Sequence, residues 1–107
     1  MDWVGIIRRC FETDSVLYSG HARREMKQEE FGEIAEHEVY EAIANCEVLE
    51  EYPDDKPYPS ALFFGMTKAY RPIHVVCAYN EGGQQAIIVT VYYPDPERWD
   101  NYRSRKR

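Results

Sequence analysis

Two histidines and one tyrosine are the side chains of this sequence whose types suit proton transfer. His21 stands in the first turn of an expected helix that Ser19 would cap, where the helix N-terminus and basic neighbours favour a neutral, proton-accepting imidazole. His74 lies within an apolar, strand-like segment, and Tyr92 lies at the end of another. A groove on a sheet that gathered the three would supply an acid and a base, so they are the candidate catalytic residues.

Each of these side chains also has a purely structural interpretation. His21 suits a helix cap or an exposed surface position, and His74 suits a buried core position with satisfied hydrogen bonds. Tyr92 is one of nine tyrosines, most of which serve packing. The sequence alone leaves both interpretations open.

A phosphodiester substrate would also need cationic and hydroxyl groups around it. Arg71 precedes the histidine-bearing strand, and Thr90 shares a strand face with the tyrosine two residues later. Arg103 and Arg105 belong to an arginine-rich tail over 97–107, which is either a phosphate clamp or a flexible, solubilising end. These four residues are the candidate substrate-binding groups.

No metal or cofactor site is predicted from the spacing of ligands. His21 and Glu25 lie one helical turn apart, as do Glu33 and His37, but two ligands do not complete a zinc site. The chain contains no glycine-rich phosphate loop, no dinucleotide-binding fingerprint and no nucleophile elbow. We therefore expect no metal and no cofactor.

The composition fits one folded unit. The 107 residues are 44% hydrophobic, which is enough for one core, and we expect residues 1–107 to form a single domain. We expect no membrane association, because no apolar run is long enough to span a bilayer and the first residues lack a secretory signal pattern. Widely spaced cysteines without a CxxC pair indicate buried thiols in a reducing, cytoplasmic compartment: Cys10, Cys46 and Cys77.

The charge is distributed unevenly along the chain. Residues 25–55, here called the acid-rich segment, contain twelve acidic residues and one basic residue, whereas residues 68–107 carry a net charge of +3. The net charge of −6 argues against a general nucleic-acid coat, which needs clustered Lys and Arg, but it leaves room for a local basic patch near the C-terminus. In a second interpretation of the same asymmetry, the acid-rich segment binds a basic partner or mimics nucleic acid, and the sheet edge pairs with another chain.

Hydrophobic periodicity and turn signals predict helices followed by a sheet. The expected elements are helices over 3–12, 20–30 and 35–46, and strands over 48–52, 60–66, 73–79 and 85–93. Short connections favour antiparallel neighbours. We therefore expect an α+β fold in which N-terminal helices (about 3–46) pack on a four-stranded antiparallel sheet (about 47–93), before the basic tail.

Four ordered blocks of residues resemble one bacterial family. The blocks are Ser19-Gly20-His21-Ala22, Glu50-Glu51-Tyr52-Pro53-Asp54-Asp55, Arg71-Pro72-Ile73-His74-Val75-Val76 and Val89-Thr90-Val91-Tyr92-Tyr93-Pro94-Asp95-Pro96-Glu97-Arg98-Trp99. Over residues 19 to about 105 the chain resembles the family called domain of unknown function 4258, which has no established activity. More distantly it resembles the RelE/ParE and MqsR-like toxin superfamily of small, metal-independent ribonucleases, which implies a RelE-like toxin fold.

The resemblance implies a metal-independent endoribonuclease of the mRNA interferase type, acting on RNA within a toxin–antitoxin pair. The implied partner is a zinc-finger antitoxin of the MqsA type. In this hypothesis His21 or His74 takes the proton of a ribose 2′-hydroxyl, and the other histidine or Tyr92 protonates the leaving oxygen. Arg71 and the tail arginines stabilise the charge on the phosphorane.

One departure from the family pattern weakens the ribonuclease hypothesis. Glu25 and Glu29 stand where the resemblance implies arginines, and carboxylates beside His21 would repel a phosphodiester. The alternative hypothesis is therefore a non-catalytic, acidic protein-interaction module, or a degenerate toxin. A third is a toxin whose acidic surface meets a basic antitoxin.

Overall fold

A computed structural model describes residues 1–107 as three helices and seven strands. In chain order these are α1 (Trp3–Glu12), β1 (Val16–Tyr18), α2 (Gly20–Gln28), α3 (Glu36–Ala44), β2 (Glu47–Tyr52), β3 (Ser60–Met66), β4 (Pro72–Asn80), β5 (Gln85–Tyr92), β6 (Trp99–Asp100) and β7 (Ser104–Arg105). The fold is α+β, as predicted. None of the helices, the longest of which has ten residues, combines the length and hydrophobicity of a membrane span.

The main sheet differs from the prediction of four antiparallel strands. It has five strands in the order β1-β5-β4-β3-β2, and β1 runs parallel to β5, whereas the other neighbouring pairs are antiparallel. The prediction missed β1 because a strand of three residues is too short to show an alternating pattern. The sheet is therefore mixed rather than purely antiparallel.

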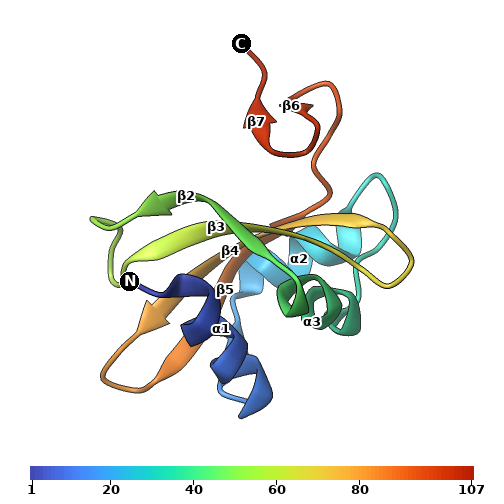
Figure 1. Cartoon of the computed structure of the whole chain (residues 1–107). Coiled ribbons are helices and arrows are strands. Elements are labelled where there is room, and N and C mark those ends of the chain that lie inside the picture. The colour runs from blue at the N-terminus through green and yellow to red at the C-terminus, as the bar shows by residue number, and fades with distance from the viewer.

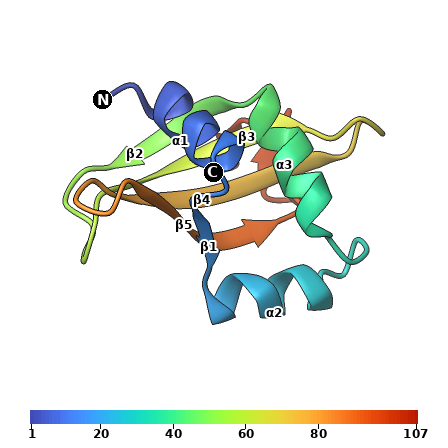
Figure 2. The ribbon, with the colours of Figure 1, turned by 90° about the horizontal axis from the view of Figure 1, so that it is seen from below.

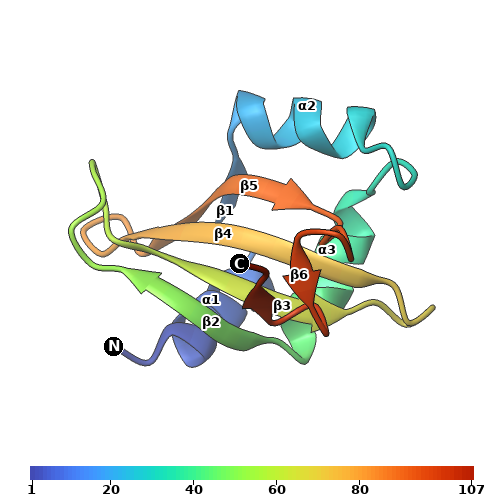
Figure 3. The same ribbon diagram turned by 90° about the horizontal axis from the view of Figure 1, so that it is seen from above.

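The elements are arranged in layers around this sheet. Helices α1 and α3 lie across one face, and α2 lies beside β5 near the edge of the sheet (Figures 1 and 2). Viewed from the other side, the small β6–β7 hairpin lies over the opposite face (Figure 3). The largest buried cluster fills the space between helices and sheet, with Ile7, Val39 and Ile43 meeting Phe63 and Val75.

The helix boundaries follow local signals in the sequence. Helix α1 spans the predicted residues, and the Asp2 side chain caps it by accepting a hydrogen bond from the Gly5 amide at 3.1 Å. The predicted cap of α2 is confirmed, since the Ser19 hydroxyl oxygen accepts from the Ala22 amide at 3.0 Å. Helices α2 and α3 end two residues before their predicted last residues, which is within the usual fraying of helix ends.

The closest approach between α3 and the sheet occurs at Gly65 in β3. A Cβ atom added to Gly65 would collide with the backbone carbonyl of Ala42. Backbone atoms in a helix and a central strand cannot move aside as a flexible side chain can. The position therefore requires glycine for packing.

We expect Gly65→Ala to lower the free energy of unfolding by about 2 kcal/mol or more, because the added methyl group forces α3 away from the sheet. Urea denaturation measures the effect. Gly82→Ala is the matched control, since no atom would lie closer than 3.6 Å to its added methyl group, and it should change stability by less than about 0.5 kcal/mol. Equal effects of the two substitutions would contradict this packing argument.

Candidate functional site

His74 and Tyr92 form a hydrogen-bonded pair on the sheet face opposite α1 and α3. They are register partners in β4 and β5, and the Tyr92 hydroxyl lies 3.2 Å from His74 Nδ1. His74 Nε2 lies 2.6 Å from the carbonyl oxygen of Tyr102. Because a carbonyl only accepts, Nε2 carries the ring proton and donates it to Tyr102, and Nδ1 accepts from the Tyr92 hydroxyl. The pair is thus fixed in one tautomer.

The His74 ring is fully enclosed, with 0% of the residue exposed. Phe64 and Trp99 contact it edge-on, with ring centroids 5.7 and 4.5 Å away. Burial lowers the pKa of His74 to about 4, and the positive charge of Arg105 adds to this effect. At neutral pH the imidazole is therefore uncharged.

Burial also governs the other member of the pair. It raises the pKa of Tyr92 to about 12, so that its hydroxyl keeps its proton at neutral pH. Neither group titrates near neutrality in this conformation. At neutral pH the pair is consequently an uncharged hydrogen-bonded unit.

The enclosure is made by residues 99–105, which we call the C-terminal hairpin. Its strands β6 and β7 pair with each other and not with the main sheet. Arg103 Nε lies 2.7 Å from Glu47, and the Arg105 guanidinium donates two hydrogen bonds to Glu50 at 3.0 and 3.2 Å. The predicted basic tail therefore folds back onto the sheet through its arginines.

The sheet surface under the hairpin carries both carboxylates and aromatic rings, and the hairpin arginines contact both kinds of side chain. Hydrogen bonds from Arg105 and Tyr52 lower the pKa of Glu50 and keep it ionised. The Arg103 guanidinium lies over the Phe64 ring at 4.8 Å. We call this surface, made by Glu47, Glu50, Phe64, His74 and Tyr92, the covered face.

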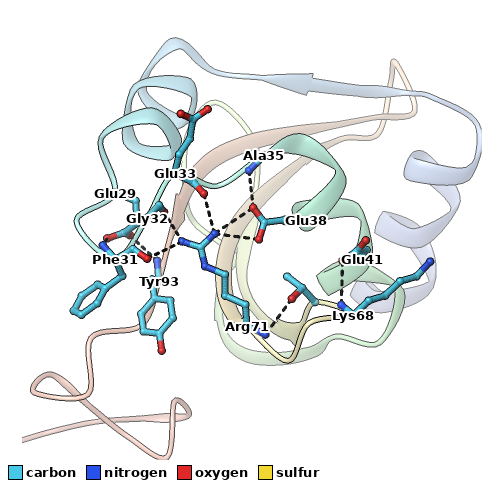
Figure 4. A network of polar contacts seen from close by, with 11 residues as sticks. Glu29, Phe31, Gly32, Glu33, Ala35, Glu38, Glu41, Lys68, Arg71 and Tyr93 are labelled. Carbon is cyan, nitrogen blue, oxygen red and sulfur yellow. Dashed lines mark hydrogen bonds and ion pairs between the residues drawn. The ribbon is translucent and has the colours of Figure 1, made fainter.

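Arg71 has a structural role just before β4, where its guanidinium lies close to the Tyr93 ring and to the loop between α2 and α3 (Figure 4). Its guanidinium donates to the carboxylate of Glu38 at 3.0 and 3.2 Å, and to the backbone carbonyls of Phe31, Gly32 and Glu33. Burial of Glu38 raises its pKa, but bonds from the Ala35 amide and from Arg71 outweigh this, and the net pKa is lowered. Arg71 thereby fastens the α2–α3 loop and the start of α3 to β4.

His21 lies on α2 and is not brought to His74. Its side chain is 59% exposed, and its Nε2 lies 3.3 Å from Glu25. Glu25 and Glu29 in turn accept hydrogen bonds from the backbone amides of Val91 and Tyr93, at 3.1 and 2.7 Å. β1 pairs only with the first part of β5, so the later amides of β5 have no neighbouring strand on that side. The two carboxylates supply the hydrogen-bond acceptors that such a strand would have provided, a role that the sequence pattern did not predict.

An open groove of about 690 Å³ separates α2 from the tail. Its lining includes the acidic residues Glu25, Glu29 and Glu30 of the acid-rich segment and the basic residues Lys106 and Arg107 of the tail. Tyr92 also lines this groove, whereas His74 does not. A ligand in the groove would therefore meet charges of both signs without reaching the imidazole.

The structure brings together part of the predicted site. His74 and Tyr92 are in contact, Arg103 and Arg105 belong to the hairpin that covers them, and Thr90 precedes Tyr92 on the same strand face. His21 and Arg71 have other partners elsewhere. The catalytic and substrate-binding roles of all seven residues stay predictions, and no group of three or more His, Cys, Asp or Glu side chains gathers as a metal site would require.

Comparison with known proteins gives one match. A family model described as Domain of unknown function (DUF4258) matches residues 18–93, which include β2 to β5 and exclude the C-terminal hairpin. Comparisons with the curated proteins and with the solved structures found no match. The predicted relationship to RelE-like and MqsR-like toxins therefore stays a prediction.

We expect Arg71→Met to lower the free energy of unfolding by about 2–3 kcal/mol, because it leaves the largely buried Glu38 carboxylate and three loop carbonyls without their donor. Arg23→Met is the matched control. Its pair with Glu36 is more than half exposed, so the loss should be about 0.5 kcal/mol or less. Denaturant unfolding compares the two, and similar losses would show that Arg71 is not a structural clamp.

We expect acidification to destabilise the fold through His74. The unfolded imidazole titrates near 6.5 and the folded one near 4, so below pH 6.5 the unfolded state binds the proton first and the stability falls. Between about pH 7 and about pH 5 the expected loss is about 2 kcal/mol, at about 1.4 kcal/mol per pKa unit. Unfolding curves at several pH values measure it. His74→Phe should remove most of the loss, whereas the exposed control His37→Gln should retain it.

Proposed function

This chain belongs to the family described as Domain of unknown function (DUF4258), and on that premise we propose that it is a non-catalytic interaction module for a basic protein partner. The family description assigns no activity, so the proposal depends on the charges and contacts of the chain itself. It places recognition on the acid-rich segment, residues 25–55.

The observation that carries the proposal is where the arginines bind. All four arginine–carboxylate pairs of the structure use a glutamate of the acid-rich segment, and these acceptors are Glu36, Glu38, Glu47 and Glu50. Two of them hold arginines that lie more than fifty residues away in sequence. The segment therefore already acts as an acceptor of guanidinium groups, which a basic partner would also present.

Access to His74 argues against phosphate chemistry. A substrate reaches the ring only if the C-terminal hairpin moves away, and the hairpin carries Arg103 and Arg105 with it. The uncovered surface then presents Glu47 and Glu50 without their cations. Two free carboxylates repel a phosphodiester and attract a cation.

The second candidate is a metal-independent endoribonuclease of a toxin–antitoxin pair, with a zinc-finger antitoxin as partner. The observation that favours it is the hydrogen-bonded His74–Tyr92 pair. In this function His74 would take the 2′-hydroxyl proton, Tyr92 would protonate the leaving oxygen, and Arg105 would stabilise the phosphorane. It requires a conformation in which the hairpin admits RNA and keeps its arginines near the site.

We expect the full chain to bind a fluorescently labelled arginine-rich peptide at low ionic strength and to release it as salt is added, because screening weakens exposed charge pairs. Fluorescence anisotropy measures the Kd. Glu47→Gln/Glu50→Gln should weaken binding about tenfold, equivalent to about 1.4 kcal/mol. The control Glu12→Gln/Glu81→Gln removes the same charge outside the acid-rich segment and should leave Kd unchanged.

The same preparation is incubated with RNA and a chelator to test the second candidate. The module proposal expects intact RNA. Cleavage by the wild-type chain that disappears in His74→Phe would overturn the proposal in favour of the endoribonuclease. Absence of salt-sensitive binding to the arginine-rich peptide would also overturn it.

A further inference from the structure

We propose that the C-terminal hairpin is a tethered stand-in for the partner, and that the partner binds the covered face with an arginine pair and an aromatic ring after displacing the hairpin. This inference rests on the proposed function and specifies its site and ligand class. It follows from the contacts of the hairpin, from its weak attachment and from its position beyond the residues that the family model matches.

The hairpin contacts the covered face as a bound peptide would. Trp99 is 5% exposed and packs edge-on against His74, and the Tyr102 carbonyl accepts the His74 ring proton. Arg103 and Arg105 add ion pairs to two carboxylates. One buried aromatic anchor surrounded by charged contacts is a common arrangement at protein interfaces.

The attachment of the hairpin is weak for a structural element. Its two strands have two residues each and no hydrogen-bonded ladder to the main sheet. The side chains of Arg103 and Arg105 remain 45% and 61% exposed, so their ion pairs contribute little net stability. Trp99 is therefore the main anchor.

The turn of the hairpin opposes closure. Asn101 and Tyr102 both have left-handed backbone conformations, with φ of 51° and 62°. Such conformations are costly for residues with a Cβ, and tyrosine lacks the local hydrogen bonding that helps asparagine. Opening the hairpin relieves this strain, which lowers the cost of displacement.

The hairpin also lies beyond the residues that the family model matches. The family match ends at residue 93, whereas Glu47, Glu50, His74 and Tyr92 all lie within it. The face is thus part of the family domain, and its cover lies beyond the matched residues.

The chemistry of the uncovered face selects the partner. Removal of the hairpin leaves two carboxylates without cations, the Phe64 ring without its guanidinium, and the His74 N–H without an acceptor. A peptide with two arginines, an aromatic ring and a free backbone carbonyl satisfies all of these groups. An anionic ligand would satisfy only the imidazole.

The covalent attachment of the hairpin determines the apparent affinity of the covered face for a free peptide. The hairpin competes at a high effective concentration because it belongs to the same chain, so a free peptide binds only the fraction of molecules that are open. Weakening the hairpin raises that fraction and lowers the apparent Kd in proportion. The ligand affinity of the face should therefore increase when the native cover is damaged.

The test uses a labelled peptide with the sequence of residues 97–107 and the full chain. Wild-type protein should bind it weakly, and Trp99→Ala should bind it at least about tenfold more tightly, as measured by anisotropy. The double variant Arg103→Gln/Arg105→Gln loosens the hairpin without disturbing buried groups, so a smaller gain of about threefold is expected. Circular dichroism establishes that each variant is folded.

Two controls identify the contacts. A peptide with glutamine in place of Arg103 and Arg105, and with its other two arginines kept, should bind Trp99→Ala no better than it binds the wild-type chain. Adding Glu47→Gln and Glu50→Gln to Trp99→Ala should remove the gain for the native peptide. Both outcomes follow if the carboxylates of the covered face receive the arginines.

Equal affinity of the peptide for folded wild-type, Trp99→Ala and Arg103→Gln/Arg105→Gln chains would overturn this inference. The proposed function would still stand if the arginine-rich peptide bound in a salt-sensitive manner, and it would fail separately if that peptide did not bind. A concentration-dependent dimer of the wild-type chain, measured by light scattering, would assign the face to the hairpin of a second copy and also overturn the inference.

Discussion

A fully buried imidazole must have a hydrogen-bond partner for each ring nitrogen, and in this protein that requirement connects the middle of the sheet to the end of the chain. His74 lies on β4, which has paired neighbours on both sides. Tyr92 on the adjacent strand satisfies one nitrogen, but the other points out of the sheet and is satisfied only by Tyr102. No buried side-chain nitrogen or oxygen in the structure lacks a partner.

Several acidic residues likewise have a hydrogen-bond donor or an arginine as a partner. Glu25 and Glu29 accept from strand amides, Glu38 accepts from Arg71, and Glu47 and Glu50 accept from the tail. Much of the acid-rich segment is therefore a set of acceptors placed where the backbone or an arginine needs one. This explains how a segment with twelve acidic residues folds without excessive repulsion.

The sequence predicted those features that have local causes. The helix over 3–12 and its successor capped by Ser19 follow from periodicity and capping, and the long strands follow from apolar runs bounded by turns. β1 was missed because it has three residues and pairs with a distant parallel strand. The tail hairpin was missed because its strands are two residues long.

The site was predicted only in part, for reasons of geometry. His74 and Tyr92 face each other because the turn after Asn80 sets the register, although a bulge beside Val76 shifts it by one residue and has no sequence signature. Arg71 binds backbone carbonyls of the α2–α3 loop. Because every residue type has a backbone carbonyl, the sequence contains no signal for this contact. The enclosure of His74 depends on a tertiary contact with the tail that no periodic pattern encodes.

The capping of β5 by two glutamates has a consequence for self-association. An exposed strand edge invites another chain to extend the sheet, and such growth leads to aggregates. Beyond β1, carboxylates already occupy two of the amides that an incoming strand would need. At the opposite edge, β2 contains Glu51, whose carboxylate has no arginine partner, and a second copy of this strand would bring two such charges close together. Glutamate side chains thus protect both edges of the sheet against pairing with further strands.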